Sequence, residues 1–525
     1  MLAIMSSLTG CEEAVQKESN ELISKTTDLG ATISSLAEIF STENIPVEGY
    51  AVIGGLNGTG STECPSEVRA YLEKYIRKQL SDHEPDVDKF LNSKDSAVVT
   101  VRGLMPAAAS KNQYFDLKVE ALPGTQTTSL EDGILYGAEL QPAGSFGLTT
   151  KILATAEGSV FINTLDTSAS MPDKKTGYIL GGGKTLDEYN ITIALKKPDY
   201  KVANLVRNRL NERFGNNTAK AISPTLIELD VPPKYNKQKQ RFISIVKAMY
   251  LSYPEKATEE RIDAFVKELA TSQDKYKSEI ALEAIGNQSC GKLAALLNSS
   301  SEQVRLAAAR CMLNMGNDQG LQPLRQIAES TDSPYRLEAL DAITKSATRN
   351  DAAAISRKLL RDDDFDIRLT AYEHLRELED VMVVQKLIAG DFYLEEITQT
   401  QHKAVFASLS GQPRIVLFGG PIYCKDDLFL QSADGSITIN APPEQRYVSI
   451  IRNHPNRPNV TAKLKSSFRL DDIIQTLCEQ TTEKDPSKKP GLGVSYAKVI
   501  AILKQMCEKG AVDAQFYAGP TPKIH

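Results

Sequence analysis

The sequence predicts an α+β protein in which a mainly β N-terminal region and small α/β units are interrupted by an inserted α-solenoid. Three observations predict this fold class. Short runs of alternating apolar and polar residues dominate residues 47–160, and two strand–helix pairs follow in residues 189–252. A repeating helical pattern then fills residues 257–389 before strand-like runs return at residue 403. The solenoid therefore interrupts the surrounding fold.

The composition is that of an ordinary globular protein. The chain has 525 residues, of which 41% are apolar and 24% are charged, so it is long enough for several domains with cores of their own. The net charge is −6, and Lys and Arg are dispersed along the chain, so we expect no nucleic-acid partner. We also expect no membrane span, because no run of apolar residues is long enough.

The N-terminus carries a candidate lipidation site. A short apolar run ends in Leu8-Thr9-Gly10-Cys11, which resembles the bacterial lipobox, although no Lys or Arg precedes it as in a usual signal peptide. A chance match is the alternative, and the true translation start stays open. We expect residues 1–11 to be a lipoprotein signal, Cys11 to take the lipid, and residues 12–44 to be a tether. The protein would then be exported and would contact a membrane only through that lipid.

Residues 45–188 are expected to form a β-rich domain. Alternating runs are separated by Gly, Pro, Asn and Ser, which is typical of strands joined by turns. One segment, residues 66–79, predicts a helix among them. The expected strands cover residues 50–56, 96–105, 114–122 and 135–140.

Residues 189–252 predict a small α/β unit. Its first helix is expected at residues 198–215, with Asp199 as the N-cap and Gly215 just beyond the end. The second helix is expected at residues 240–251. Alternating runs at residues 189–195 and 225–231 predict its two strands.

Residues 257–389 predict helical repeats. An R-L-x-A motif recurs at Arg305, Arg336 and Arg368, at spacings of 31 and 32 residues. Two helices per unit at this period are typical of a stacked α-solenoid. The units resemble HEAT-like repeats, a family in which an Arg or Asp ties adjacent units together. We expect a weaker copy at residues 279–286, and second helices at residues 321–328, 352–360 and 381–388.

Residues 403–525 return to a mixed pattern. A polar linker, residues 481–491, is expected to separate two helices at residues 471–479 and 496–510. The expected strands lie within residues 403–420, 435–441, 445–451 and 511–517.

Two glycine-rich stretches raise the question of nucleotide binding. From Gly55 to Thr62 the sequence reads G-x-x-x-x-G-S-T, but Ser61 stands where a phosphate-binding loop needs Lys, and Pro65 follows before any helix. The stretch Gly177–Thr185 contains the Lys-Thr pair but lacks the first glycine and precedes a strand-like run. We therefore keep a nucleotide-binding enzyme at Gly55–Thr62 only as a remote alternative.

Other catalytic patterns are weak. The five histidines show no metal-ligand spacing, and the acidic residues around His83 are more typical of a solvated turn. The seven cysteines include no C-x-x-C pair, so apart from Cys11 they predict either disulfides, whose pairing stays open, or buried free thiols. We predict no enzyme activity, no metal site and no cofactor.

The stretch Val47–Thr62, "VEGYAVIGGLNGTGST", resembles the N-terminal signature of the bacterial flagellar P-ring protein family, which reads G-Y-G-L-V-x-G-L-N-G-T-G-D. The likeness covers residues 45–252 and 403–518, and the glycine stretch at 175–185 falls where the family has a loop. Three departures stand out: the inserted repeats, the lipidation motif and a poor match over residues 423–469. The signature residues are Gly54, Gly55, Leu56, Asn57, Gly58, Thr59 and Gly60. We expect this stretch to be a strand that ends in a tight glycine turn, at or near a contact between subunits.

The resemblance implies a structural role. Members of this family self-associate into a ring around the flagellar rod in the periplasm, and the ring acts as a bushing together with the outer-membrane L-ring. Rod and L-ring proteins are therefore the implied partners, and Cys11 would anchor the ring to the outer membrane. The repeats would offer a surface to peptidoglycan or to a protein. The alternative is a non-flagellar envelope scaffold or adaptor with the same ring-type core.

Overall fold

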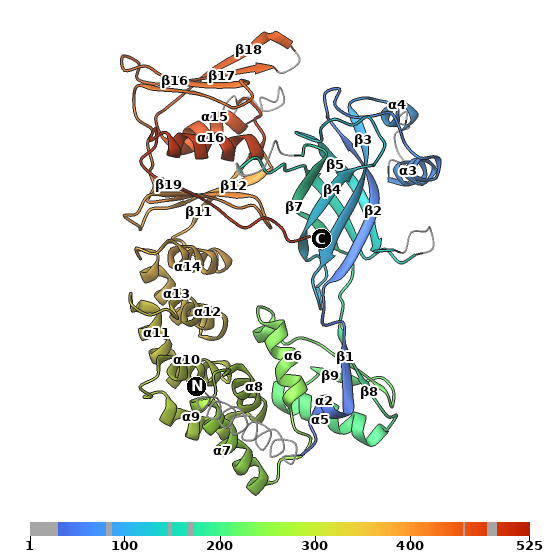
Figure 1. Cartoon of the computed structure of the whole chain (residues 1–525), viewed down its shortest axis with the longest axis vertical. Coiled ribbons are helices and arrows are strands. Elements are labelled where there is room, and N and C mark those ends of the chain that lie inside the picture. The colour runs from blue at the N-terminus through green and yellow to red at the C-terminus, as the bar shows by residue number, and fades with distance from the viewer. Residues whose placement is uncertain are drawn as a thin grey trace, which may run out of the picture. The chain divides into compact units, whose positions relative to one another are not determined.

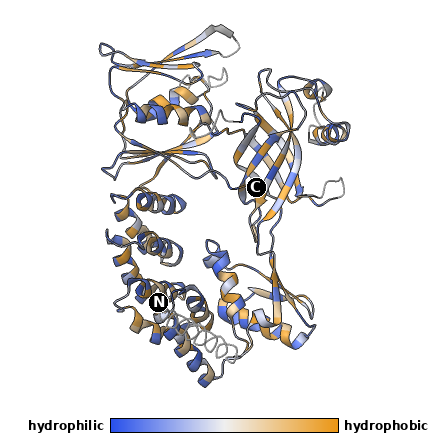
Figure 2. Cartoon of the chain, in the orientation of Figure 1, coloured by the Kyte–Doolittle hydropathy of each residue, from blue (hydrophilic) through white to orange (hydrophobic). Residues whose placement is uncertain are grey.

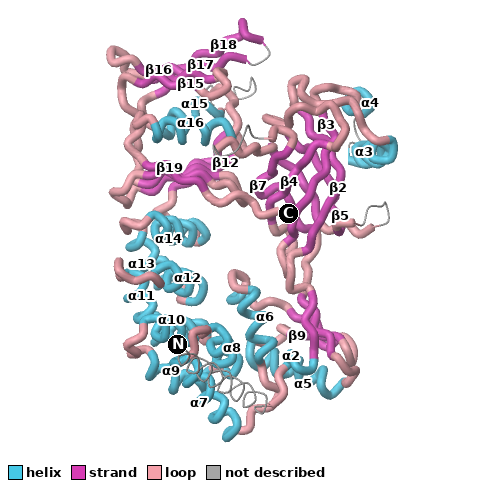
Figure 3. The backbone as a smooth tube through the Cα atoms, in the orientation of Figure 1, coloured by secondary structure: helices cyan, strands magenta, loops and turns pink. Residues whose placement is uncertain are grey.

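The structure is a computed structural model that describes residues 30–79, 87–144, 150–165, 173–454, 457–479 and 491–524. These residues divide into two compact units. One unit contains residues up to Thr42 together with Asn190–Leu359 and Leu369–His374, and the other contains Glu43–Tyr189, Leu360–Arg368 and Leu375–His525. Strands dominate the second unit, whereas helices dominate the first (Figure 3). The fold is α+β, as the sequence predicts.

Six strands of the second unit close into a barrel in the order β2-β3-β4-β7-β6-β5 (Figure 1). Apolar side chains alternate along each strand, so that one set fills the barrel interior, including Val47, Ile53, Val101 and Leu117. The alternation is visible as bands of orange and blue in Figure 2. The strands are β2 Ile45–Gly54, β3 Ser96–Met105, β4 Tyr114–Ala121, β5 Ile134–Pro142, β6 Ala154–Ser159 and β7 Thr176–Thr185, with helices α3 Ser66–Gln79 and α4 Val87–Leu91 between β2 and β3.

The barrel corrects one expectation. The glycine stretch at residues 177–185, expected to be a loop, is strand β7, which pairs with β4 and β6. Its glycines permit close packing, since a Cβ on Gly183 would lie 2.7 Å from the Phe115 ring. Small side chains in a tight barrel therefore make a strand look like a loop in sequence.

The rest of the second unit contains two sheets with helices between them (Figure 1). One sheet has the order β11-β12-β14-β13-β19 and the other the order β15-β16-β17-β18. Side chains of both sheets and both helices form a single apolar core. The elements are β11 Val384–Ile388, β12 Phe392–Ile397, β13 Ala404–Ala407, β14 Arg414–Phe418, β15 Leu428–Gln431, β16 Ile437–Ala441, β17 Val448–His454, β18 Arg457–Ser466, α15 Leu470–Cys478, α16 Tyr496–Glu508 and β19 Gln515–Ala518.

The first unit begins with a four-stranded sheet of order β1-β8-β10-β9. Asp199 caps the first long helix as expected, because its carboxylate accepts from the amides of Lys201 and Val202, and Gly215 follows the helix with φ +112°. The elements are α2 Ile33–Leu36, β1 Ala37–Phe40, β8 Ile191–Leu195, α5 Tyr200–Phe214, β9 Ala219–Ala221, β10 Leu226–Leu229 and α6 Lys239–Ala248.

The end of the expected tether is folded. Residues 37–40 form β1, which pairs antiparallel with β8, and the amide of Ile33 donates to Met249 O at 2.9 Å. A tether reaching residue 44 is therefore wrong for the described residues. The alternation of Ala37, Glu38, Ile39 and Phe40 is too short to predict a strand without its partner.

The helical repeats form two-helix units (Figure 3). The R-L-x-A motifs fall in α10, α12 and α14, as the sequence predicts. The expected helix at residues 381–388 is wrong, because Val384–Ile388 is strand β11 and pairs with β12. The helices are α7 Glu255–Thr271, α8 Tyr276–Ile285, α9 Cys290–Leu296, α10 Glu302–Asn314, α11 Leu321–Glu329, α12 Arg336–Ser346, α13 Arg349–Leu359 and α14 Phe365–Glu377.

Candidate assembly site

The signature residues form a tight turn at the end of strand β2. Gly55 and Gly58 have φ values of +78° and +88°, and Asn57 has a φ of 49°, so the chain passes through the left-handed region three times in four residues. This conformation suits glycine and is tolerated by Asn, which explains the composition of the turn. The expectation of a strand that ends in a glycine turn is confirmed.

The turn is bonded to two neighbouring segments of the barrel. The Thr59 hydroxyl lies 2.8 Å from Leu56 O and from Ser129 O, and its one proton is shared between these two acceptors. Gly60 lies so close to β3 that a Cβ at this position would be 2.0 Å from Ser96 O. Because backbone is the obstacle, only glycine fits at residue 60. The turn is therefore held to the barrel end by hydrogen bonds and close packing.

The backbone N–H groups of the turn already donate hydrogen bonds within the protein. A phosphate-binding loop needs several backbone N–H groups that point at the anion. Here four of them donate to carbonyl oxygens of the protein, so they cannot also cradle a phosphate. The bonds run from Leu56 N to Asp95 O (2.9 Å), Thr59 N to Leu56 O (3.1 Å), Gly60 N to Lys94 O (2.8 Å) and Ser61 N to Ser96 O (2.9 Å).

Asp116 on β4 joins the barrel to the C-terminal part of the same unit. Its Oδ1 accepts from the amide of Gly181 at 2.7 Å and from the amide of Gly411 at 2.9 Å. Its Oδ2 accepts from the Ser410 hydroxyl at 2.6 Å. One carboxylate therefore holds the turn before β14 against strand β7.

Lys498 on α16 makes a second joint in this unit. Its ammonium group lies 2.6 Å from Asp132 and 3.9 Å from Asp434. Burial lowers the pKa of Lys498, but the nearby carboxylates outweigh this and raise it above its ordinary value. Burial raises the pKa of Asp434, but bonds from Ser432 and Ser436 together with Lys498 bring it below its ordinary value. Both groups are therefore charged at neutral pH.

The three motif arginines of the repeats occupy equivalent places. Each side chain reaches back from its own helix to carbonyl oxygens at the end of the preceding helix or in the turn that follows it. Unpaired carbonyls at helix ends need such donors, so each arginine ties one helix to the previous one. The bonds run from Arg305 Nη1 to Ser299 O (2.8 Å) and Ser300 O (3.1 Å), from Arg336 Nε to Ala328 O (3.1 Å), and from Arg368 Nη1 to Asp362 O (2.6 Å) and Asp363 O (2.9 Å).

A buried ionic cluster connects the α/β sheet region to the repeats within the first unit. Arg241 on α6 donates to Glu279 at 2.9 Å and to Glu283, and both glutamates lie on α8. Arg310 on α10 donates to both carboxylate oxygens of Glu279, at 2.6 and 3.0 Å. Asn314 donates to Glu283 at 3.0 Å. The glutamates are almost completely buried, so these donors replace the water that each carboxylate loses on folding.

The cluster holds Arg241 in its charged form. Burial lowers the pKa of Arg241, but Glu283 and Glu279 outweigh it and raise that pKa above its usual range. Lys234, just before α6, adds a further bond to Asn314 O at 2.6 Å. Helices α6, α8 and α10 are thus fixed to one another by charge-assisted hydrogen bonds.

The structure leaves two of the residues considered from the sequence untested. Cys11 and His83 lie outside the described residues. The six described cysteines are free thiols, and burial raises the pKa of Cys424 to about 11 and of Cys507 to about 12, which makes them poor nucleophiles. The described part of the chain has no cluster of His, Cys, Asp or Glu arranged to hold a metal ion.

Among the helices of the described ranges, none combines the length and the apolar content needed to cross a bilayer.

Comparison with known proteins identifies the region that carries the glycine turn. A family model described as "Flagellar P-ring protein" matches residues 32–263. These residues are similar to the flagellar P-ring protein family. The matched segment includes the barrel, the sheet of the first unit and helix α6, so the turn at Gly55–Gly60 lies inside it. A second model, "HEAT repeats", matches residues 262–344, from α7 to α12.

Individual flagellar P-ring proteins agree with this assignment. The protein of Thermotoga maritima is 31% identical over 211 residues, which is 38% of this chain and 60% of the relative. That of Pseudothermotoga lettingae is 27% identical over 238 residues, 43% of this chain and 68% of the relative. That of Aquifex aeolicus is 26% identical over 219 residues, 39% of this chain and 58% of the relative. The chain therefore spans about 60% of the length of the Thermotoga maritima relative.

The ionic cluster lies where the two family matches meet. Arg241 belongs to the P-ring match, whereas Glu279, Glu283 and Arg310 belong to the HEAT match. Sequence reasoning missed this cluster and also Asp116. One signal was present: Glu279 and Glu283 are four residues apart in a helix whose other residues after Ser278 are all apolar, so both carboxylates fall on one buried face.

Proposed function

We propose that this chain is a ring-forming structural component of the bacterial flagellar basal body and has no enzymatic role. The family match over residues 32–263 carries this proposal. The geometry of the signature turn supports it, because the glycines serve backbone packing and the amides of Leu56, Thr59, Gly60 and Ser61 are bonded within the protein. The related proteins are named for a ring of the flagellum.

The proposed location is the periplasm. The chain would be exported, Cys11 would anchor it to the outer membrane, and the ring would surround the rod as a bushing together with the L-ring. Rod and L-ring proteins would be its partners. Residues 403–518, which resemble the family but lie beyond the matched segment, would complete the ring-type core.

A second candidate function is favoured by the HEAT match at residues 262–344. In this alternative the chain is a non-flagellar envelope scaffold, and the repeats bind a protein or peptidoglycan. Solenoid repeats commonly present an extended surface to a partner. The same ring-type core would then serve a structure other than a flagellum.

Two experiments test these proposals. Electron microscopy of the purified full chain should show annular particles, and a purely monomeric chain at all concentrations would refute ring formation. Removal of the gene should abolish motility and leave basal bodies without this ring. Motile cells with complete basal bodies would instead favour the envelope scaffold.

The lipid anchor has its own test. Metabolic labelling with a radioactive fatty acid should mark the wild-type chain, and the Cys11→Ser variant should lose the label and leave the membrane fraction. An unlabelled wild-type chain would exclude the anchor without affecting the ring.

A further inference from the structure

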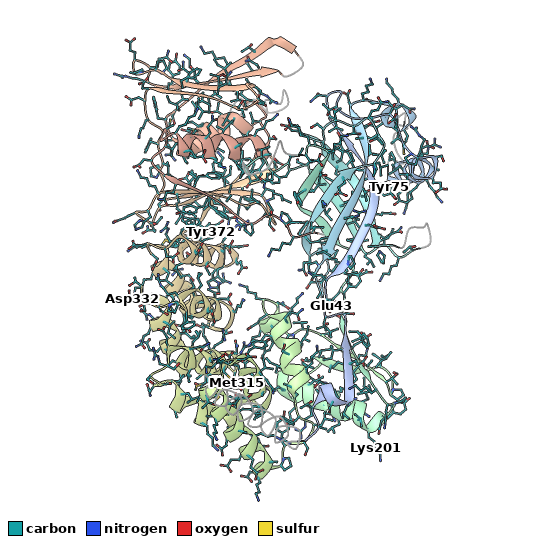
Figure 4. All side chains as sticks on the ribbon, viewed as in Figure 1. Glu43, Tyr75, Lys201, Met315, Asp332 and Tyr372 are labelled. Atoms are coloured by element: carbon teal, nitrogen blue, oxygen red, sulfur yellow. The ribbon has the colours of Figure 1, made fainter. Side chains whose placement is uncertain are left out.

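An apolar groove lies in the first unit, where the α/β sheet region meets the repeats. It is an open space of about 410 Å³ lined by residues of helices α2, α6, α7 and α8. Tyr250, Phe265 and Ala281 form part of its floor. They belong to an apolar core that extends to Met315, which Figure 4 labels. A volume of this size is typical of pockets that hold a ligand.

The rim of the groove is basic. Among the described residues that line it, the charged ones are Lys247 on α6 and Lys277 on α8, and both are exposed. Lys196 lies close by, because its ammonium group donates to the carbonyl oxygens of Ser34 and Ser35 at 3.4 and 3.2 Å. Three cations therefore surround an apolar floor.

The carboxylates of α8 do not cancel this charge. Glu279 and Glu283 are bound to arginines in the buried ionic cluster. Asp274, just before α8, stands beside the rim and accepts from the amide of Tyr276 at 3.0 Å. With three lysines against this one carboxylate, the groove suits a ligand that combines apolar groups with negative charge.

The described part of the chain begins beside this groove. Thr32 and Ser34 line it, and the amide of Leu251 donates to Ala31 O at 3.3 Å. Gly30 has a φ of +101°, and a glycine with positive φ commonly follows the last residue of a helix.

Gly30 also lies against helix α7. A Cβ at this position would be 2.8 Å from Arg261 Nη2. Arg261 and Phe265 are four residues apart on α7, which is about one helical turn. The segment that precedes Gly30 therefore starts about one turn away from the floor of the groove.

That segment, residues 12–29, lies outside the described residues and has a complementary composition. It contains five carboxylates and two lysines, which gives a net charge of −3. Leu22 and Leu29 are seven residues apart, a spacing that places both on one side of a helix. Glu21 and Asp28 directly precede them. The segment thus combines apolar side chains with negative charge.

We propose that residues 12–29 bind the groove of their own chain. The leucines contact the apolar floor, and the carboxylates lie beside Lys247 and Lys277. Leu22 precedes Gly30 by eight residues, about 12 Å in a helix, so the segment reaches the groove directly. The bound segment covers the line where the two family matches meet, at residues 262–263.

This inference goes beyond the proposed function and depends neither on ring formation nor on a lipid. It makes residues 12–29 a part of the first unit rather than a tether. If Cys11 carries a lipid, that lipid then lies close to the first unit.

The test uses the fluorescence of a single tryptophan in the full chain. The natural sequence contains no Trp, so Tyr276→Trp on the rim of the groove reports its surroundings alone. Adding L22D/I23D should shift the emission to longer wavelength and increase quenching by acrylamide, because the tryptophan becomes exposed. The matched control S24D/T27D adds the same charge to the same segment without removing an apolar side chain, and should leave the emission unchanged.

Charge reversal tests the ionic part of the contact. In the Y276W chain, K247E/K277E should shift the emission in the same direction as L22D/I23D. Adding E21K/D28K should then restore it, since the signs on both sides are exchanged. Circular dichroism separates loss of this contact from unfolding of the first unit.

The possible outcomes are distinct. Emission that L22D/I23D does not change would overturn the proposal, and so would a failure of E21K/D28K to restore the K247E/K277E chain. Emission that depends on protein concentration would mean that a second copy occupies the groove and would also overturn it. Annular particles are not part of this readout, so failure of the ring function would leave a positive result standing.

Discussion

Arg241 and Glu283 form a buried ion pair across two helices that belong to different family matches. Arg241 Nε donates to Glu283 Oε2 at 3.0 Å, and the Glu283 side chain is only 2% exposed. Arg241 lies in the P-ring match and Glu283 in the HEAT match. The repeats are therefore joined to the α/β sheet region of the P-ring match by more than their covalent connection.

This pair predicts a large effect of a single substitution. Arg241→Ala would leave Glu283 buried with only Asn314 as a side-chain donor, and should lower the free energy of unfolding of this region by about 3–5 kcal/mol. Denaturant unfolding followed by circular dichroism measures it. Lys345→Ala is the control, because its bond to Asp341 is exposed and worth less than about 0.5 kcal/mol. Equal losses in both variants would contradict the role of the cluster.

Gly60→Ala should destabilise the barrel. The added Cβ would meet the backbone of Ser96, which cannot move without shifting β3, so we expect a loss of about 3 kcal/mol. The matched control is Gly291→Ala. Gly291 lies in α9 with open space around it, so this change should stabilise by about 0.5–1 kcal/mol. A Gly60→Ala protein with wild-type melting temperature would refute the steric argument.

Asp116→Ala should loosen the joint between the barrel and the C-terminal part. The amides of Gly181 and Gly411 would lose their acceptor, so their hydrogen exchange should become faster. Asp116→Asn keeps one acceptor oxygen and should give an intermediate effect. Unchanged exchange at both glycines in Asp116→Ala would show that other contacts hold this joint.

The lowered pKa of Asp434 predicts a pH dependence. A carboxyl whose pKa is lower in the folded state stabilises the protein above its unfolded pKa, and this contribution is lost as the pH falls through the folded pKa. Asp434→Asn should therefore lower the melting temperature near pH 7, and the difference from wild type should shrink below the ordinary pKa of 3.8. Asp426→Asn, at an exposed position, is the control. A difference that persists at pH 2 would contradict the electrostatic origin.

Elements with strong local signals were predicted well from sequence. Strand β3 and helix α3 have the expected bounds, and α5 begins after its Asp199 cap and ends before Gly215. The turn at Gly55–Gly60 was also predicted as a turn, because positions with positive φ favour Gly and Asn, and these residue types are recognisable in the sequence. These features depend on residues that are close together in the chain.

The errors concern strands with distant partners. Residues 37–40 pair with β8, about 150 residues away, and residues 384–388 were predicted as a helix before the structure showed a strand. Strand β7 was expected to be a loop, because its glycines are more typical of turns than of strands. A short strand is stable only with its partner, so its own residues carry little signal.

The sequence by itself therefore determined the α+β class, the repeat period, the glycine turn and the family resemblance. Only the tertiary structure decided the carboxylate joint at Asp116, the ionic cluster around Glu279 and Glu283, and the apolar groove beside Lys247 and Lys277. The physical reason is the range of the interactions. Helix caps and turns depend on interactions between a few neighbouring residues. Buried charges and apolar grooves depend on contacts with partners that folding brings from distant parts of the chain.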